Sequence, residues 1–117
     1  MIETAIKKYL EEGLKDVPVL MEYPKDHPQQ FVVLQLTDAG RINHIDAATF
    51  FLDVYDIDSL YSAAELKEKV KELLFDAITL PYITSSTLGQ ERAGTDSGNH
   101  VYKYELTFNF YYYKEEI

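Results

Sequence analysis

The sequence predicts an α+β fold, in which a four- to five-stranded antiparallel or mixed sheet carries two helices on one face. Two segments, near residues 2–10 and 62–78, have apolar side chains at helical spacing. Residues 102–112 alternate between apolar and polar side chains, with the period of two that is typical of a strand. At 117 residues the chain is long enough for one core, so we expect residues 1–117 to form a single domain.

The first predicted helix is followed by extended chain. Its apolar stripe consists of Ile2, Ala5, Ile6, Tyr9 and Leu10. Gly13 and the pair Val17-Pro18 end it, because proline disfavours a helical conformation in the residue before it. The next segment, VPVLMEYP, has prolines that restrict it to an edge strand or a strand end.

A central antiparallel hairpin is expected next. FVVLQLTD, residues 31–38, is apolar and β-branched enough for a strand buried on both faces. Residues 38–41, Asp-Ala-Gly-Arg, have turn chemistry, and we place the turn there. The run from about 42 to 55 then alternates between apolar and polar positions and pairs with the first strand.

The second predicted helix opens at the capping-box pattern Ser62-Ala63-Ala64-Glu65. Pro81 ends it. Its buried stripe is expected to contain Leu66, Val70, Leu73, Leu74, Ala77 and Ile78. Its solvent-facing side is expected to contain Lys67, Glu68, Lys71 and Glu72.

A long-tipped hairpin over residues 83–113 completes the fold. Residues 85–100 are polar and lack apolar periodicity, so we expect a mobile loop that orders on assembly. The residues singled out in this loop are Gly89, Arg92, Gly94, Asp96 and Gly98. In the strand that follows, the even-numbered side chains face the core.

Composition excludes several classes of protein. The formal charge of −9 argues against general nucleic-acid binding, which depends on Lys and Arg at the phosphates. The chain has no cysteine, so we expect neither disulfides nor thiolate chemistry. The N-terminal segment mixes acidic and basic residues, and no run reaches the roughly 20 apolar residues of a membrane helix. We therefore expect no signal peptide and no contact with a membrane.

Candidate catalytic residues are few. His27, His44 and His100 form no metal-ligand pattern, and a pair of His44 and Asp46 has no nucleophile beside it. Asp53, Asp56 and Asp58 form an acidic cluster of the kind that holds divalent ions in nucleases, although no accompanying base is evident. We interpret Asp56 and Asp58 as groups that shape the turn into the following helix and favour its positive end. The sequence predicts no enzyme, no cofactor and no metal.

The C-terminal aromatic residues suggest an interface instead. The chain has 10 Tyr and 6 Phe residues, and seven of these aromatic residues lie in the C-terminal segment HVYKYELTFNFYYYKEEI. Too few basic residues accompany them for a surface on which nucleic-acid bases stack. Tyr111 and Tyr113 fall on the face opposite the core. With Phe51 they are the side chains we expect to meet a neighbouring subunit.

The segment NHIDAATFFLDVYD followed by SLYSAAELKEKVKE, within the overall order of elements, resembles small neck proteins of tailed phages and prophages. The family is that of tail terminators, also described as tail-completion or minor capsid proteins. The resemblance implies a ring, typically a hexamer, that closes the tail tube and contacts the head connector while DNA passes through the lumen without specific binding. It also implies a virion protein that is assembled in the cytoplasm of the bacterial host.

Two alternatives stay open. The first is a small metal-dependent nuclease or hydrolase that uses His44 and the cluster of Asp53, Asp56 and Asp58. The second is a ligand- or peptide-binding module that uses a sheet edge.

Overall fold

The computed structural model describes residues 1–26, 28–96 and 101–117. Helix α1 (Ile2–Leu14) leads into the two-residue strand β1 (Val19–Leu20), which is followed by β2 (Gln30–Ile42) and β3 (Ile45–Asp56). Helix α2 (Leu60–Asp76) continues as a short 3₁₀ turn, η1 (Ala77–Thr79). The chain ends with β4 (Ile83–Asp96), β5 (Val101–Tyr112) and a second 3₁₀ turn, η2 (Lys114–Glu116).

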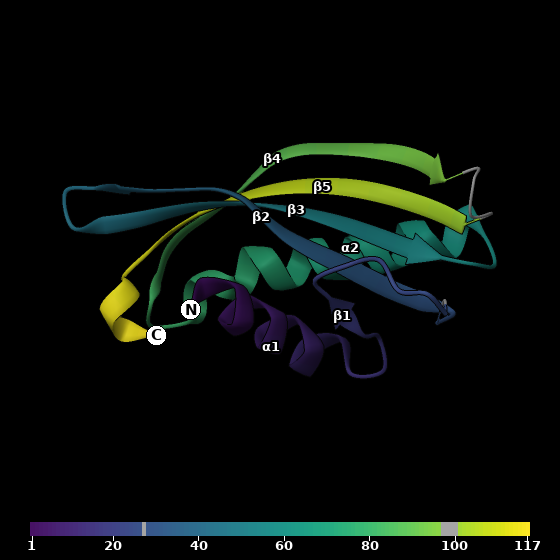
Figure 1. The fold of residues 1–117 in the computed structure, drawn as a ribbon, viewed down its shortest axis with the longest axis horizontal. Helices are drawn as coiled ribbons and strands as arrows, with labels where there is room; N and C mark the ends of the chain where they lie inside the picture. The colour runs from purple at the N-terminus through teal and green to yellow at the C-terminus, as the bar shows by residue number, and fades with distance from the viewer. Residues whose placement is uncertain (27, 97–100) are drawn as a thin grey trace.

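The five strands form one mixed sheet in the order β1-β2-β3-β5-β4. Only the β1–β2 pair is parallel, and the other three pairs are antiparallel. Both helices pack beneath the same face of the sheet, as Figure 1 shows. The predicted α+β class, the mixed sheet and the two helices are confirmed.

The main core lies between this sheet face and the helices. Alternate residues of β3 and β5, such as Phe50 and Phe108, are fully buried against Ile6, Leu10 and Leu74 from the helices. Each such side chain contributes about 1.5–3 kcal/mol by leaving water. The predicted burial of the even-numbered residues of β5 is correct for Leu106, Phe108, Phe110 and Tyr112, whereas Tyr102 and Tyr104 are half-buried.

A second, smaller cluster covers one end of the opposite sheet face. Phe31 and Tyr55 stack with their ring centroids 4.6 Å apart, and Tyr23 meets both rings edge-on. Val33 and Val101 complete the cluster. This cluster explains why the first residues of β2 are buried on both faces.

The hairpin turn between β2 and β3 lies later than predicted. Residues 38–41 belong to β2, and the turn consists of Asn43 and His44, which have positive φ angles of 48° and 70°. Two consecutive left-handed residues make the turn whose twist matches paired strands, and Asn tolerates that conformation well. The longer strands form an arm that extends beyond the helices (Figure 1). We call residues 38–47 the hairpin arm.

Helix α2 begins one turn earlier than the capping-box pattern predicts. Ser59 is the N-cap, and its hydroxyl accepts a hydrogen bond from the backbone N–H of Ser62 at 3.0 Å. The predicted buried stripe of α2 is confirmed for Leu66, Val70, Leu74 and Ala77. Ile78, however, is 56% exposed, because it lies beyond the end of the helix in η1. Lys67, predicted to face solvent, is 7% exposed.

The C-terminal hairpin is present, but its strands are longer than predicted. β4 pairs with β5 from Ile83 to Asp96, with irregular register near residues 83–85 and 88–90. The expected loop is therefore wrong for residues 85–96. Gly89, Arg92, Gly94 and Asp96 all lie in β4, and Gly98 lies outside the described residues.

Candidate functional site

The residues of the predicted hydrolase site do not come together. His44 is exposed in the turn at the tip of the hairpin arm. Asp53 lies nine residues further along β3, which corresponds to roughly 30 Å of extended strand. His44 is also not on a strand face with Asp46, since the turn places it outside β3. No single active site can include both His44 and the acidic cluster.

Asp56 has a structural role at the end of β3. Its carboxylate is almost fully buried and accepts a hydrogen bond from Gln30 Nε2 at 2.7 Å. Its other oxygen accepts from the backbone N–H groups of Asp58 and Ser59, at 2.7 and 3.2 Å. Asp58 in turn accepts a hydrogen bond from Gln29. These contacts bind both carboxylates into the turn that starts α2, as the sequence interpretation proposed.

Asp53 lies on the sheet face that the helices leave uncovered. Burial raises the pKa of its carboxyl group, and Glu105 adds to the effect, while Lys103 and Arg92 oppose it. Glu105 itself is engaged by Arg92 at 2.6 Å and by Lys103 at 3.1 Å. Within the described ranges, no group of three His, Asp or Glu side chains is arranged to hold a metal ion.

Asp46 is a buried carboxylate on the helix-facing side of the hairpin arm. Its Oδ1 lies 4.0 Å from Arg41 Nη1, and its Oδ2 has no hydrogen-bond partner among the described residues. Its cross-strand neighbour is Tyr112, whose pKa is raised by burial and further by Asp46 and Glu3. Arg41 also contacts Glu115 at 3.5 Å and so links the hairpin arm to the C-terminal turn η2.

The three residues predicted to meet a neighbouring subunit are exposed. Phe51 is 47% exposed, Tyr111 is 43% exposed and Tyr113 is 40% exposed. Phe51 and Tyr111 lie on the helix-free face, where their cross-strand neighbours are Thr107 and Ala47. Tyr113 follows the end of β5, and its backbone N–H donates to Tyr82 O at 2.8 Å.

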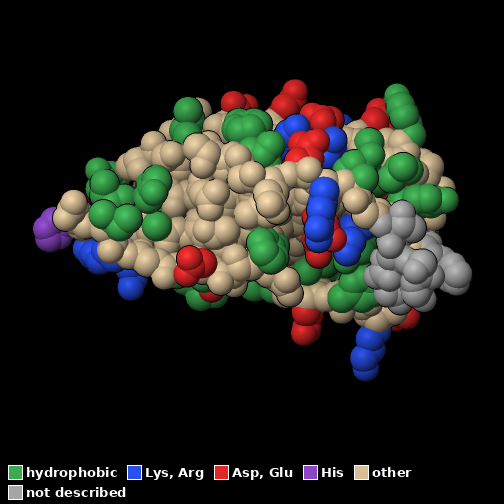
Figure 2. All heavy atoms as spheres, turned by 90° about the horizontal axis from the view of Figure 1, so that it is seen from above, with side chains coloured by type: hydrophobic (Ala, Val, Ile, Leu, Met, Phe, Trp, Pro, Cys, Tyr) green, Lys and Arg blue, Asp and Glu red, His purple; other side chains and the backbone are tan. Residues whose placement is uncertain are grey.

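Figure 2 views the molecule from above, the side away from helix α1. Hydroxyl, amide and backbone atoms dominate the middle of this view, and acidic and basic side chains alternate in a band to its right. At the left end, which carries the hairpin arm, histidine and basic side chains lie near the tip, and acidic side chains lie farther in.

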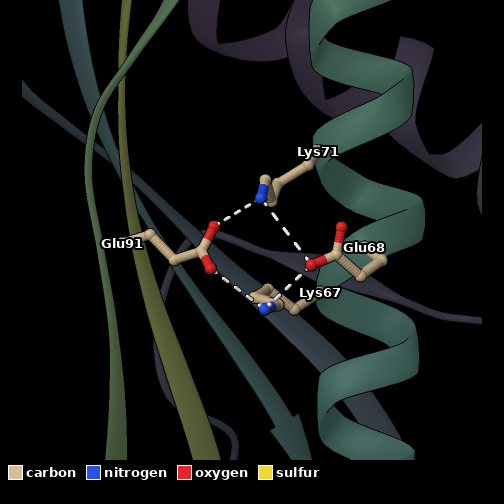
Figure 3. Close-up of polar contacts among 4 residues, drawn as sticks. All are labelled: Lys67, Glu68, Lys71 and Glu91. Atoms are coloured by element: carbon tan, nitrogen blue, oxygen red, sulfur yellow. Dashed lines mark hydrogen bonds and ion pairs between the residues drawn. The ribbon is translucent and has the colours of Figure 1, made fainter.

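A network of four charged side chains, which the sequence reasoning missed, fastens β4 to α2 (Figure 3). Glu91 binds Lys71 at 2.6 Å and Lys67 at 3.1 Å, and Glu68 binds Lys67 at 3.0 Å. The ammonium of Lys67 also lies 4.7 Å from the centre of the Tyr104 ring. Burial disfavours the charge of Lys67, but hydrogen bonds to Glu68 and Glu91 outweigh it and raise its pKa. Apolar spacing alone could not reveal this network, because Glu91 belongs to a distant strand.

Comparisons with known proteins add no further evidence on function. No family model matches the chain, and no curated protein matches it in sequence. Neither helix of the described structure is long and apolar enough to cross a membrane.

Proposed function

We propose that this chain is a non-enzymatic assembly protein of tailed phages, which forms a ring that terminates the tail tube and joins it to the head. The observation that carries the proposal is the pair of unpaired edges on the sheet. β4 is the last strand on one side, and no described strand pairs with its outer edge. On the other side β1 pairs with β2 at Val32 and Val33, and no described strand pairs with that edge of β2 from Leu34 to Ile42.

The strand directions at the two free edges allow identical copies to associate head to tail, with one edge of each copy against the opposite edge of the next. β2, β3, β5 and β4 are successively antiparallel, so β2 and β4 run in opposite directions. In a ring whose axis runs along the strands, β4 of one copy would lie antiparallel to β2 of the next. Edges of this kind are open to pairing with another chain, and head-to-tail contacts close into rings when the rotation between copies permits.

The exposed aromatic side chains supply the second part of the proposed subunit contact. Tyr and Phe are enriched where proteins meet, because they bury large areas at a low cost in conformational entropy. Phe51, Tyr111 and Tyr113 are the proposed contacts between copies. The tail-tube protein and the head connector are the proposed partners above and below the ring.

The charge supports passage of DNA rather than its retention. With a formal charge of −9, the chain lacks the excess of Lys and Arg that phosphate binding requires. A lumen lined by such a protein would let DNA pass without specific binding, in a virion assembled in the bacterial cytoplasm.

The test combines association with targeted variants. The wild-type chain should form a discrete ring, observed by native mass spectrometry and negative-stain microscopy at high concentration or on purified tail tubes. A double variant, Tyr111→Ser with Tyr113→Ser, should assemble less while its monomer stays folded by circular dichroism. Tyr61→Ser is the matched control, because Tyr61 is 74% exposed on α2 and away from the sheet. A strictly monomeric species at every concentration, without affinity for tail-tube protein, would refute the proposal.

The unpaired edges also favour a second candidate, a ligand- or peptide-binding module that uses a sheet edge. A hollow of about 750 Å³ borders β1 and is lined by Leu20, Met21, Tyr23 and Pro24 together with Lys7, Glu22 and Lys25. This candidate predicts that the monomer binds an extended peptide saturably without self-association. The ring proposal predicts the reverse.

A further inference from the structure

Lys15, directly after α1, has a strained backbone. Its φ and ψ angles are 64° and −81°, close to those of a γ-turn with positive φ, which is rare in proteins. The backbone N–H of Asp16 donates to Leu14 O at 2.9 Å across this turn. The other positive φ angles among the described non-glycine residues belong to Asn43 and His44, where the hairpin turn requires them. The connection from a helix to a strand has no such requirement.

The connection that contains Lys15 is short and fixed at both ends. The N–H of Lys15 still donates to Glu11 O at 2.9 Å, as the last bond of α1. Pro18 O accepts a hydrogen bond from the N–H of Val32 at 3.0 Å, which ties the chain to β2. Residues 15–17 therefore make up the whole connection. A strained conformation persists only where the surrounding structure enforces it, and here the packing of α1 on its own sheet does so.

The contacts that hold α1 in place do not involve the connection. Ile2, Ile6 and Leu10 are buried in the main core. The hydroxyl of Tyr9 donates to Leu73 O of α2 at 2.6 Å. Gly13 allows the two helices to approach closely, because a Cβ atom at this position would lie 2.5 Å from Leu73 Cδ2. Helix α1 of a second copy can make every one of these contacts.

We propose that two copies of this chain exchange α1, so that each α1 packs against α2 and the sheet of the other copy. Short connections under strain favour such an exchange. In the exchanged state Lys15 relaxes to helical angles, and α1 continues toward Val17 until Pro18 ends it. Because the contacts of α1 are the same in both states, the released strain of two connections is set against the cost of bringing two chains together. The exchange goes beyond the proposed ring and does not depend on it.

Disulfide trapping tests the exchange, because the chain contains no cysteine. A Cβ atom at position 13 would lie 3.2 Å from Leu73 Cγ, which is the place that the Sγ of a cysteine takes. Cysteines at these positions can therefore reach the roughly 3.5–4.5 Å between Cβ atoms of a disulfide. A chain that carries both Gly13→Cys and Leu73→Cys should form the disulfide within the folded monomer, which serves as the control for folding and geometry.

The single variants then report exchange between chains. Gly13→Cys and Leu73→Cys are purified separately, and each is incubated at high concentration, alone and in an equimolar mixture, before oxidation. Exchange places position 13 of one copy against position 73 of the other. The mixture should therefore yield roughly tenfold more linked dimer than either variant alone on a non-reducing gel. No linked dimer in the mixture, or equal yields in the single variants, would overturn the proposal.

Variants of Lys15 separate exchange from a contact between unexchanged copies. Lys15→Gly, introduced into both cysteine variants, adopts a positive φ without strain, so it should lower the yield of linked dimer by about fivefold. Lys15→Ala is the matched control, because it also removes the lysine side chain but keeps the Cβ atom, and it should not lower the yield. An unchanged yield with Lys15→Gly, or an equal loss with Lys15→Ala, would contradict the role of the strained connection.

Discussion

The network that joins β4 to α2 makes a strong prediction about stability. Replacing Glu91 by glutamine keeps the shape of the side chain but removes the charge that binds both Lys67 and Lys71. Lys67 would then keep its charge while 7% exposed, and Glu68 would be the remaining acidic partner of its ammonium in this network, beside the Tyr104 ring. The variant should be less stable than the wild-type chain.

The size of the effect follows from burial. Removing one partner of a fully buried ion pair costs about 3–5 kcal/mol, whereas an exposed pair contributes about 0–1 kcal/mol. The side chains of Lys67 and Glu91 are 9% and 29% exposed, so the cost should lie between these limits, at about 1–3 kcal/mol. Glu68→Gln is the matched control and should cost less, since the Glu68 side chain is 59% exposed.

The pH dependence of the stability difference shows whether the effect of Glu91→Gln comes from the lost charge or from altered packing. Hydrogen bonding from Lys71, and further contacts with Lys67, hold the pKa of Glu91 below its ordinary value despite partial burial. The stabilisation is therefore present above the unfolded pKa of about 4.3, and it is lost as the pH falls through the lower folded value. Urea unfolding of wild type and Glu91→Gln should differ at pH 7, and the difference should shrink as the pH falls below about 4.3. Equal losses for Glu91→Gln and Glu68→Gln, or a difference that does not shrink on acidification, would refute this reasoning.

Three further predictions concern single positions. Ser59→Ala should lower the unfolding free energy by about 1 kcal/mol in urea titrations, because Ser59 is the N-cap of α2. Ser62→Ala is the control and should lower it by much less. His44→Gly should raise the unfolding free energy by up to about 1 kcal/mol, because a left-handed φ of 70° costs a residue with a Cβ roughly 1–2 kcal/mol, which exceeds the roughly 0.5–1 kcal/mol that glycine loses in chain entropy. A loss of stability would contradict the turn geometry. Asp53→Asn should raise the melting temperature at pH 7, because burial raises the pKa of Asp53 and disfavours its charged form. That gain should disappear as the pH falls below about 4, where the wild-type carboxyl group is also neutral, and an unchanged gain at pH 3 would count against it.

Local periodicity was sufficient to predict most of the buried framework. The stripe of α1, the alternation of β3 and the even face of β5 depend on neighbours close in sequence, which is why they could be read directly. Edge placement of the VPVLMEYP segment also followed from its prolines, and β1 is an edge strand.

The wrong predictions concern residues whose conformation or burial depends on partners far away in the sequence. β4 has few apolar residues, and it is a strand because β5 supplies its hydrogen bonds along its whole length. Gly40 appeared to mark a turn, but the turn formed at Asn43 and His44. Likewise, Lys67 is buried because Glu91, 24 residues away, supplies a charge partner.

The candidate site was predictable only in part. Exposure of Phe51, Tyr111 and Tyr113 followed from strand alternation and chain position, as the structure confirms. The charge network could not be derived, because it requires a particular strand and a particular helix to come together in space.

Self-association of the wild-type chain tests the central proposal most directly. Native mass spectrometry over a range of concentrations, with and without purified tail tubes, measures the number of copies in each species. We predict one discrete closed assembly, a hexamer, populated at high concentration or on the tube. A chain that stays monomeric throughout and does not bind tail tubes would contradict the account.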